Sequence, residues 1–183
     1  MPNWVSNDLI VTATKKFQAE LKYFKEFAKL ETEEDKDRSL EVLNANNFIP
    51  SPYNEISREK IRISKISNFA KRKDEEILFN LKYGGKNENE GWYDWNVKNW
   101  GSKWNFCSTC LAEETDKKLF YTFDSAWSPM LPVICAMAKK YPNLKFNLKY
   151  YERGMGFSGS VVLHNNKVIK DSHNNNYRGW RGG

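Results

Sequence analysis

The chain has few residues of the types that catalysis and metal binding require. It holds two histidines and three cysteines among 183 residues. An odd number of cysteines, without secretory features, favours free thiols over disulfides. Cys107 and Cys110 have C-x-x-C spacing, but a zinc site needs a second ligand pair, and only Cys135, His164 and His173 remain. We therefore predict no bound metal and no cofactor.

Other signals are also missing. No run of about 18 apolar residues occurs, so no transmembrane helix is expected. Residues 1–8 lack the basic and apolar regions of a signal peptide, which predicts a cytoplasmic protein without membrane contact. Gly154, Gly156 and Gly159 precede an expected strand rather than a helix, which favours a tight turn or bulge over a nucleotide-binding loop. Because no nucleophile and base are recognisable, we predict no catalytic residue and no enzyme activity.

The charge balance favours an acidic partner. The formal net charge is +6 and the isoelectric point is about 9.1, which is compatible with nucleic-acid binding. Half of this excess lies in residues 165–183. The 15% aromatic content compensates in buried area for a hydrophobic fraction of 40%. This length predicts one domain with an insertion.

The apolar periodicity predicts an α+β fold. We expect the following order: a strand over 5–12, a helix over 14–30, strands over 104–112 and 117–123, a helix from 129 to 141, and a strand over 144–150. This order is the split βαβ, or ferredoxin-like, arrangement, with an antiparallel sheet and helices on one face. An extra C-terminal β-hairpin is expected over 157–163 and 168–169. The domain should span residues 1–173.

A mostly helical insertion is predicted at about residues 31–100. It should contain a charged connector over 31–37, a helix over 58–73 with Ile61, Ile66, Phe69 and Ala70 turned inward, a mobile turn over 84–91, and a short helix over 92–99 that ends at Gly101. The pattern over 77–83 fits a helix or a strand equally. The insertion is a candidate cover for the second face of the sheet.

Tryptophan is concentrated in one segment, since four of the seven lie in residues 92–104. The favoured interpretation is a core that joins the insertion to the sheet, with Trp104 and Trp127 buried and close together. In that case Trp127→Ala would cost roughly 3–5 kcal/mol. The alternative is an exposed sheet face on which aromatic rings stack on bases.

Three motifs and the start of the chain resemble one known family. They are Met1-Pro2-Asn3-Trp4, Asn99-Trp100-Gly101-Ser102-Lys103-Trp104, Ala126-Trp127-Ser128-Pro129 with Pro132, and Tyr150-Tyr151-Glu152 before Gly154-Met155-Gly156-Phe157. In this order they resemble the YubB ferredoxin-like domain family, small proteins of plasmids, phages and other mobile elements. Met130 stands where the family pattern usually has a second proline. The resemblance implies the fold over nearly the whole chain and a mobile-element setting, without a defined biochemical activity.

The resemblance implies a non-enzymatic accessory protein that binds a host macromolecule. Its specific form would be a counter-defence inhibitor such as an anti-CRISPR, and its partner a host protein or ribonucleoprotein complex in the bacterial cytoplasm. One alternative is a nucleic-acid-binding module that uses the aromatic and basic residues. Another is a pocket that sequesters a nucleotide, or an uncharacterised enzyme.

Candidate binding residues lie within the motifs and the tail. A pocket would be lined by Trp100, Lys103, Trp127 and Glu152, with Arg153 beside it. Asp94, Asp124 and Glu152 would meet in space, and the favoured interpretation is that they form structural ion pairs with Lys103 and Arg153. The tail, residues 174–183, contributes Arg178, Trp180 and Arg181 as contacts for an acidic partner or phosphate. Because the tail has few apolar groups, we expect it to be flexible and its deletion to leave melting unchanged.

Overall fold

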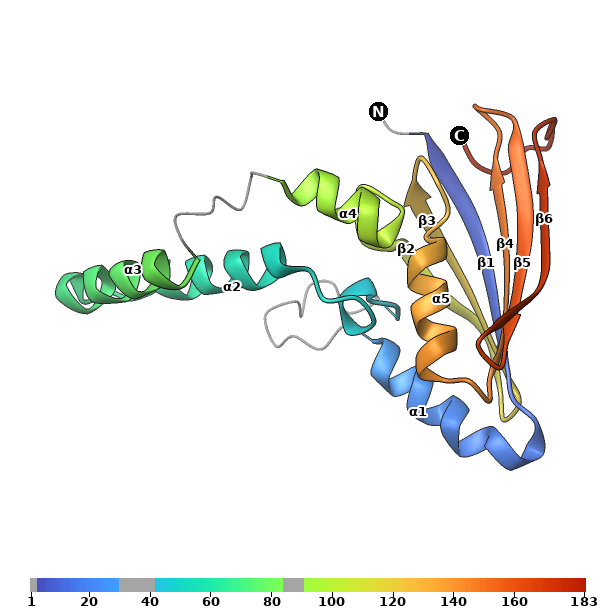
Figure 1. The fold of residues 1–183 in the computed structure, drawn as a ribbon, viewed down its shortest axis with the longest axis horizontal. Helices are drawn as coiled ribbons and strands as arrows, with labels where there is room; N and C mark the ends of the chain where they lie inside the picture. The colour runs from blue at the N-terminus through green and yellow to red at the C-terminus, as the bar shows by residue number, and fades with distance from the viewer. Residues whose placement is uncertain (1–2, 30–41, 84–90) are drawn as a thin grey trace.

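The computed structural model describes residues 3–29, 42–83 and 91–183 (Figure 1). Within these ranges one antiparallel sheet has the order β2-β3-β1-β4-β5-β6. Its strands are β1 (Trp4–Thr12), β2 (Cys107–Thr115), β3 (Lys118–Ala126), β4 (Lys145–Glu152), β5 (Phe157–His164) and β6 (Lys167–Asn174). Helices α1 (Gln18–Ala28) and α5 (Leu131–Lys140) connect them as the ferredoxin-like order requires, which confirms the predicted fold class.

The core lies between the sheet and these two helices. Alternate residues of β1 are buried, as expected for a strand with one face on the core, and Leu9 and Val11 are fully enclosed. Phe24 of α1 is the central aromatic contact, with its ring 5.3 Å from Tyr141 and 5.5 Å from Phe146. Leu148 of β4 completes this layer. The opposite face of the sheet, here called the outer face, has no described helix over it (Figure 1).

The insertion contains three helices: α2 (Pro52–Ser64), α3 (Phe69–Tyr83) and α4 (Trp92–Trp100). The prediction of a single helix over 58–73 is therefore wrong, because the helix is interrupted at residues 65–68. There the side chain of Asn68 accepts the backbone N–H of Lys71 and starts a new helix. The undecided segment 77–83 is helical. Ile61 and Phe69 are exposed rather than turned inward.

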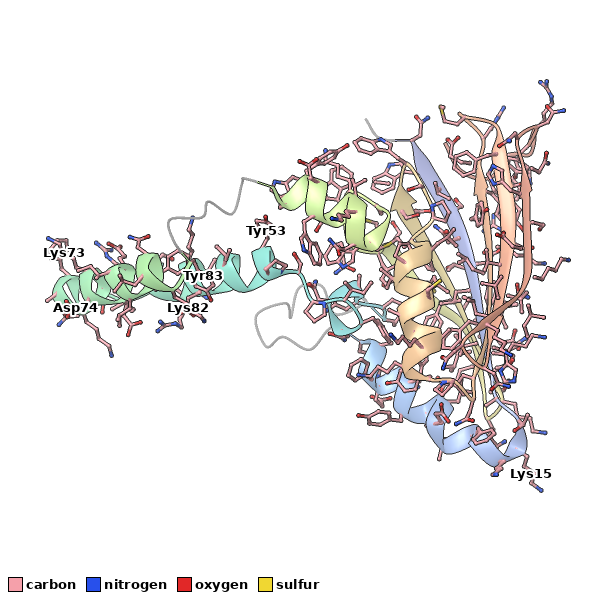
Figure 2. The ribbon with its side chains drawn as sticks, in the orientation of Figure 1. Lys15, Tyr53, Lys73, Asp74, Lys82 and Tyr83 are labelled. Atoms are coloured by element: carbon pink, nitrogen blue, oxygen red, sulfur yellow. The ribbon has the colours of Figure 1, made fainter. Side chains whose placement is uncertain are left out.

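Helices α2 and α3 pack side by side as an arm that projects away from the sheet, with Lys73 and Asp74 at its far tip (Figures 1 and 2). The arm has its own small core of Ile56, Ile63 and Phe79. It lies on the same side of the sheet as α1 and α5, so it does not cover the outer face. The sequence pattern suggested such a cover because it identifies apolar faces without identifying their partners.

Residues 175–183 return to the sheet instead of extending freely. The N–H of Gly183 donates to the carbonyl of Trp4 at 2.8 Å, and Arg181 forms a bidentate pair with Asp8 at 2.5 and 2.7 Å. This arrangement differs from the expectation of a flexible tail. One charged residue and backbone hydrogen bonds supply contacts that apolar content alone does not reveal. The expectations for residues 31–37 and 84–90 fall outside the described ranges.

Candidate functional site

Two of the sequence motifs interlock near the start of β1. Gly101 ends α4 in a left-handed conformation with φ of 75°, and its N–H donates to Val97. The hydroxyl of Ser102 then accepts the N–H of Ala126 at 3.1 Å, and the hydroxyl of Ser128 donates to the carbonyl of Gly101. The motifs 99–104 and 126–129 are thus one structural clamp that joins the insertion to the end of β3.

Trp100 is part of this clamp and not of a pocket. Its side chain is 2% exposed, its indole N–H donates to the carbonyl of Ile49 at 2.9 Å, and its ring meets that of Trp95 edge to face. The core interpretation of the tryptophan segment is therefore correct for Trp100. Sequence spacing did not indicate the bond to Ile49, which lies 51 residues away.

Beside the clamp, aromatic side chains gather around one lysine. The Nζ atom of Lys103 lies 4.5 Å from the ring centroid of Trp104, 5.4 Å from that of Trp127 and 6.0 Å from that of Tyr93. Trp4 stacks obliquely on Trp104 at 5.7 Å. These distances are those of cation–π contacts. We call Trp4, Tyr93, Lys103, Trp104 and Trp127 the aromatic patch.

Trp127 has an unusual conformation within this patch. It is 42% exposed and has a φ of 70°. The prediction that it is mostly buried is wrong, because the clamp forces the chain through a left-handed position that turns the indole outward. The backbone N–H of Trp127 donates to the carbonyl of Asn3 at 2.9 Å, which holds this turn against β1. Lys103 and Trp127 are thus brought together as predicted, although at the surface.

A shallow hollow of about 490 Å³ borders the patch on the outer face. Trp4, Ser6, Ser108 and Asp124 line it together with residues 182–183. The hydroxyl of Ser6 donates to Asp124 at 3.3 Å. Asp94 is an exposed residue of α4, and Glu152 is buried at the end of β4. The three carboxylates therefore do not meet in space as expected, and among the described residues no group of three potential metal ligands occurs.

Glu152 serves the turn that follows β4. It is fully buried, and its carboxylate accepts the backbone N–H groups of Gly154 and Met155. Such hydrogen bonds satisfy a buried carboxylate without a basic partner. The predicted pocket of Trp100, Lys103, Trp127 and Glu152 is consequently not assembled, since two of its members are enclosed and committed to internal bonds.

The basic candidates of the tail separate into two groups. Arg181 is held by Asp8 and lies over the ring of Tyr151, and its pKa is raised above the ordinary value mainly by the hydrogen bonds to Asp8. Arg153 and Arg178 are exposed and line one hollow near the β4–β5 turn. Trp180 is 82% exposed.

Cys107, Cys110 and Cys135 are not joined in disulfides. Cys107 lies opposite Asp124 and Cys110 opposite Thr122, so both belong to the outer-face row of β2. Alternation predicts opposite faces for residues three apart, but a bulge between the two cysteines changes the register. Burial raises the pKa of the Cys135 thiol.

These features define a ferredoxin-like domain that bears a helical arm and a partly exposed aromatic patch. Residues 103–178 match the family model described as "Ferredoxin-like domain in Api92-like protein". The structure is similar to the crystal structure of a protein api92 from Yersinia pseudotuberculosis, with a TM-score of 0.53, 9% identity, and coverage of 95% of this chain and 98% of that chain. At that identity the similarity concerns the fold.

No curated protein matches the chain. The comparisons agree with the predicted ferredoxin-like domain and do not contain the YubB name. Within the described ranges, no helix combines the length and apolar character needed to cross a bilayer.

Proposed function

We propose that this protein is a non-enzymatic binding protein and that the aromatic patch is part of its partner interface. The observation that carries the proposal is Trp127, an exposed indole on a left-handed backbone beside Tyr93 and Lys103. A bulky residue with positive φ is rare and costs conformational energy. Such strain is concentrated at functional sites, where the surrounding structure maintains it.

The composition of the patch supports an interface. Tryptophan and tyrosine are enriched among the residues that dominate binding energy, because they bury a large area with few rotatable bonds. The indole N–H and the ammonium group of Lys103 add polar donors to that apolar area. The clamp makes the surface rigid before binding, which lowers the entropic cost of association.

For the partner, we propose a host protein or ribonucleoprotein complex. The support is the net charge of +6, which favours an acidic surface, together with the mobile-element setting that the motif resemblance implies. A counter-defence inhibitor such as an anti-CRISPR is the specific form of this proposal. In a bacterium with an active CRISPR system, expression of the protein should then restore plaque formation by a targeted phage.

The variant Trp127→Gly tests the interface. Glycine removes the indole and adopts positive φ without strain, so the fold should be retained. Retention of the partner from host lysate, and relief of interference, should fall at least tenfold. Tyr23→Ala is the matched control, since it removes an exposed ring from α1, away from the patch, and both activities should persist. Full activity of Trp127→Gly would contradict the proposal.

A second candidate is a module that binds single-stranded nucleic acid on the outer face. The favouring observation is that this face carries Lys145 and Lys149 along β4 with no described helix above them. Phosphates of a strand would meet these two lysines. The affinity for an oligonucleotide should then fall steeply as salt rises, and a salt-independent affinity would contradict phosphate contacts.

The remaining alternative, a nucleotide-sequestering pocket, has less support because Trp100 and Glu152 are enclosed. A thermal-shift screen against nucleotides tests it, since a ligand that binds only the folded state raises the melting temperature.

A further inference from the structure

A second polar hollow lies away from the clamp, between the β4–β5 turn and the segment after β6. Its volume is about 460 Å³, within the range of about 300–1,000 Å³ that small-ligand sites occupy. Arg153 and Met155 line it from the turn, and Asn175, Asn176 and Arg178 line it from the other side. The N–H of Tyr177 donates to the carbonyl of Gly156 at 2.7 Å and joins the two walls.

The hollow is basic. Its two charged lining residues are both arginines, and none of the side chains that line it is acidic. Glu152 lies beneath the turn, but it is fully buried and its oxygens already accept the N–H groups of Gly154 and Met155. Arg181, the neighbouring cation, is neutralised by Asp8. The positive charge that remains at the surface therefore belongs to Arg153 and Arg178.

We propose that this hollow binds a phosphate group. Arg153 and Arg178 line the hollow from its two walls, and each planar guanidinium offers paired donors that match the spacing of phosphate oxygens. The carboxamides of Asn175 and Asn176 supply further donors at the rim. Neither wall depends on the aromatic patch, so this inference is independent of the function proposed above.

Nearby aromatic side chains favour a phosphate that belongs to a nucleotide or a nucleic-acid strand over free phosphate. Tyr177 lines the hollow, and its ring lies 5.6 Å from that of Tyr151. Trp180 follows Arg178 by two residues, which places it within about 7 Å along the chain, and it leaves most of its indole in solvent. A base attached to a bound phosphate would stack on this indole. Free phosphate would gain nothing from it.

The experiment measures the binding of inorganic phosphate, a nucleoside monophosphate and a short oligothymidylate to the full chain by calorimetry and thermal shift. Arg153→Gln and Arg178→Gln should each weaken phosphate binding about tenfold or more, because each removes charge-assisted hydrogen bonds. Lys15→Gln is the control. It removes the same charge from an exposed site at the α1 end of the molecule, and binding should be unchanged (Figure 2).

Trp180→Ser separates the sources of the phosphate. If it weakens nucleotide and oligonucleotide binding while inorganic phosphate binds as before, the ligand is a nucleotide or a strand. If each of the three ligands binds Trp180→Ser as tightly as it binds the wild type, the ligand is phosphate itself. No binding by the wild type, or an equal loss in Lys15→Gln and the two arginine variants, overturns the inference. Trp127→Gly should bind phosphate normally, so failure of one proposal does not imply failure of the other.

Discussion

At the scale of single residues, the backbone of Trp127 combines strain with an exposed ring. A left-handed conformation costs an L-residue with a side chain roughly 1–2 kcal/mol, whereas glycine adopts it freely. The residue is 42% exposed, so removal of its side chain loses only part of the hydrophobic free energy that a fully buried indole contributes.

This yields a prediction about two substitutions at one position. Trp127→Ala should lower the free energy of unfolding by about 1–2 kcal/mol, less than the 3–5 kcal/mol typical of an enclosed aromatic residue. Trp127→Gly should be at least as stable as the alanine variant, because alanine keeps the strained Cβ. Urea unfolding of both variants measures the difference. A loss above about 3 kcal/mol for alanine would place the ring in the core.

Tyr121 presents the opposite situation. It is fully buried in β3, and its hydroxyl has no hydrogen-bond partner in the described part of the chain. An unsatisfied buried hydroxyl costs about 1–3 kcal/mol. Tyr121→Phe should therefore leave the free energy of unfolding unchanged or raise it by about 1 kcal/mol. Tyr150→Phe is the control, since the Tyr150 hydroxyl bonds His173 at 3.2 Å and its loss should be destabilising.

The same burial predicts sensitivity to alkali. Desolvation raises the pKa of Tyr121 and raises that of Tyr141 to about 12, above the ordinary value of about 10. Between the ordinary pKa and the raised pKa, the two tyrosines keep their hydroxyl protons in the folded state and lose them in the unfolded state. The free energy of unfolding therefore falls as the pH rises from about 10 to 12. Tyr121→Phe should show a smaller fall in denaturation midpoint at about pH 11. An equal fall in both proteins would mean that Tyr121 does not contribute.

At the scale of elements, the α2–α3 arm is energetically separate from the sheet. Its core of Ile56, Ile63 and Phe79 is distinct from the main cluster, and exposed apolar residues such as Phe69 and Leu81 add little to stability. The start of the arm lies close to the residue that precedes α4. A Cβ placed on Gly91 would lie 2.7 Å from the hydroxyl of Tyr53.

The arm should therefore be removable. Replacement of residues 53–90 by a short glycine and serine linker should leave the sheet folded, with the melting temperature within about 5 °C of the wild type. The clamp and the bond from Trp100 to Ile49 lie outside the excised segment, so the aromatic patch should persist. Near-ultraviolet circular dichroism and thermal melting measure this. Loss of the cooperative transition would show that the arm is needed for folding.

At the scale of the whole molecule, the tail connects the C-terminal end to the central strand. The Arg181–Asp8 pair is partly buried, with side-chain exposures of 27% and 16%, and Gly183 continues the contact at Trp4. A bidentate, partly buried ion pair contributes more to the free energy of unfolding than an exposed ion pair does. The tail is therefore part of the outer face.

Deletion of residues 175–183 should lower the free energy of unfolding by about 1–3 kcal/mol, or roughly 2–10 °C in melting temperature. This reverses the expectation from composition. Arg181→Ala should account for about half of the loss, whereas Arg178→Ala, which removes an exposed arginine from the same tail, should have almost no effect. A melting temperature unchanged by the deletion would restore the view of an idle tail.

The sequence alone determined the order of elements in the domain. The alternation of buried residues in β1 and β4 and the apolar stripe of α5 are local periodicities. They can therefore be recognised without knowing which elements pack against them. Gly101 was recognisable as a helix end for the same reason, since only its own backbone conformation is involved. Lys103 and Trp127 were correctly associated because their motifs flank a hairpin, β2–β3, that returns the chain to one end of the sheet.

Tertiary structure alone decided which side chains are exposed and what they contact. Trp100 and Trp127 look alike in the sequence, yet one donates to Ile49 in the core and the other is turned outward by a clamp between segments 24 residues apart. The bond from Arg181 to Asp8 spans 173 residues, and no local pattern encodes it. Periodicity records which face is apolar, whereas long-range packing determines what covers that face and what is left to bind a partner.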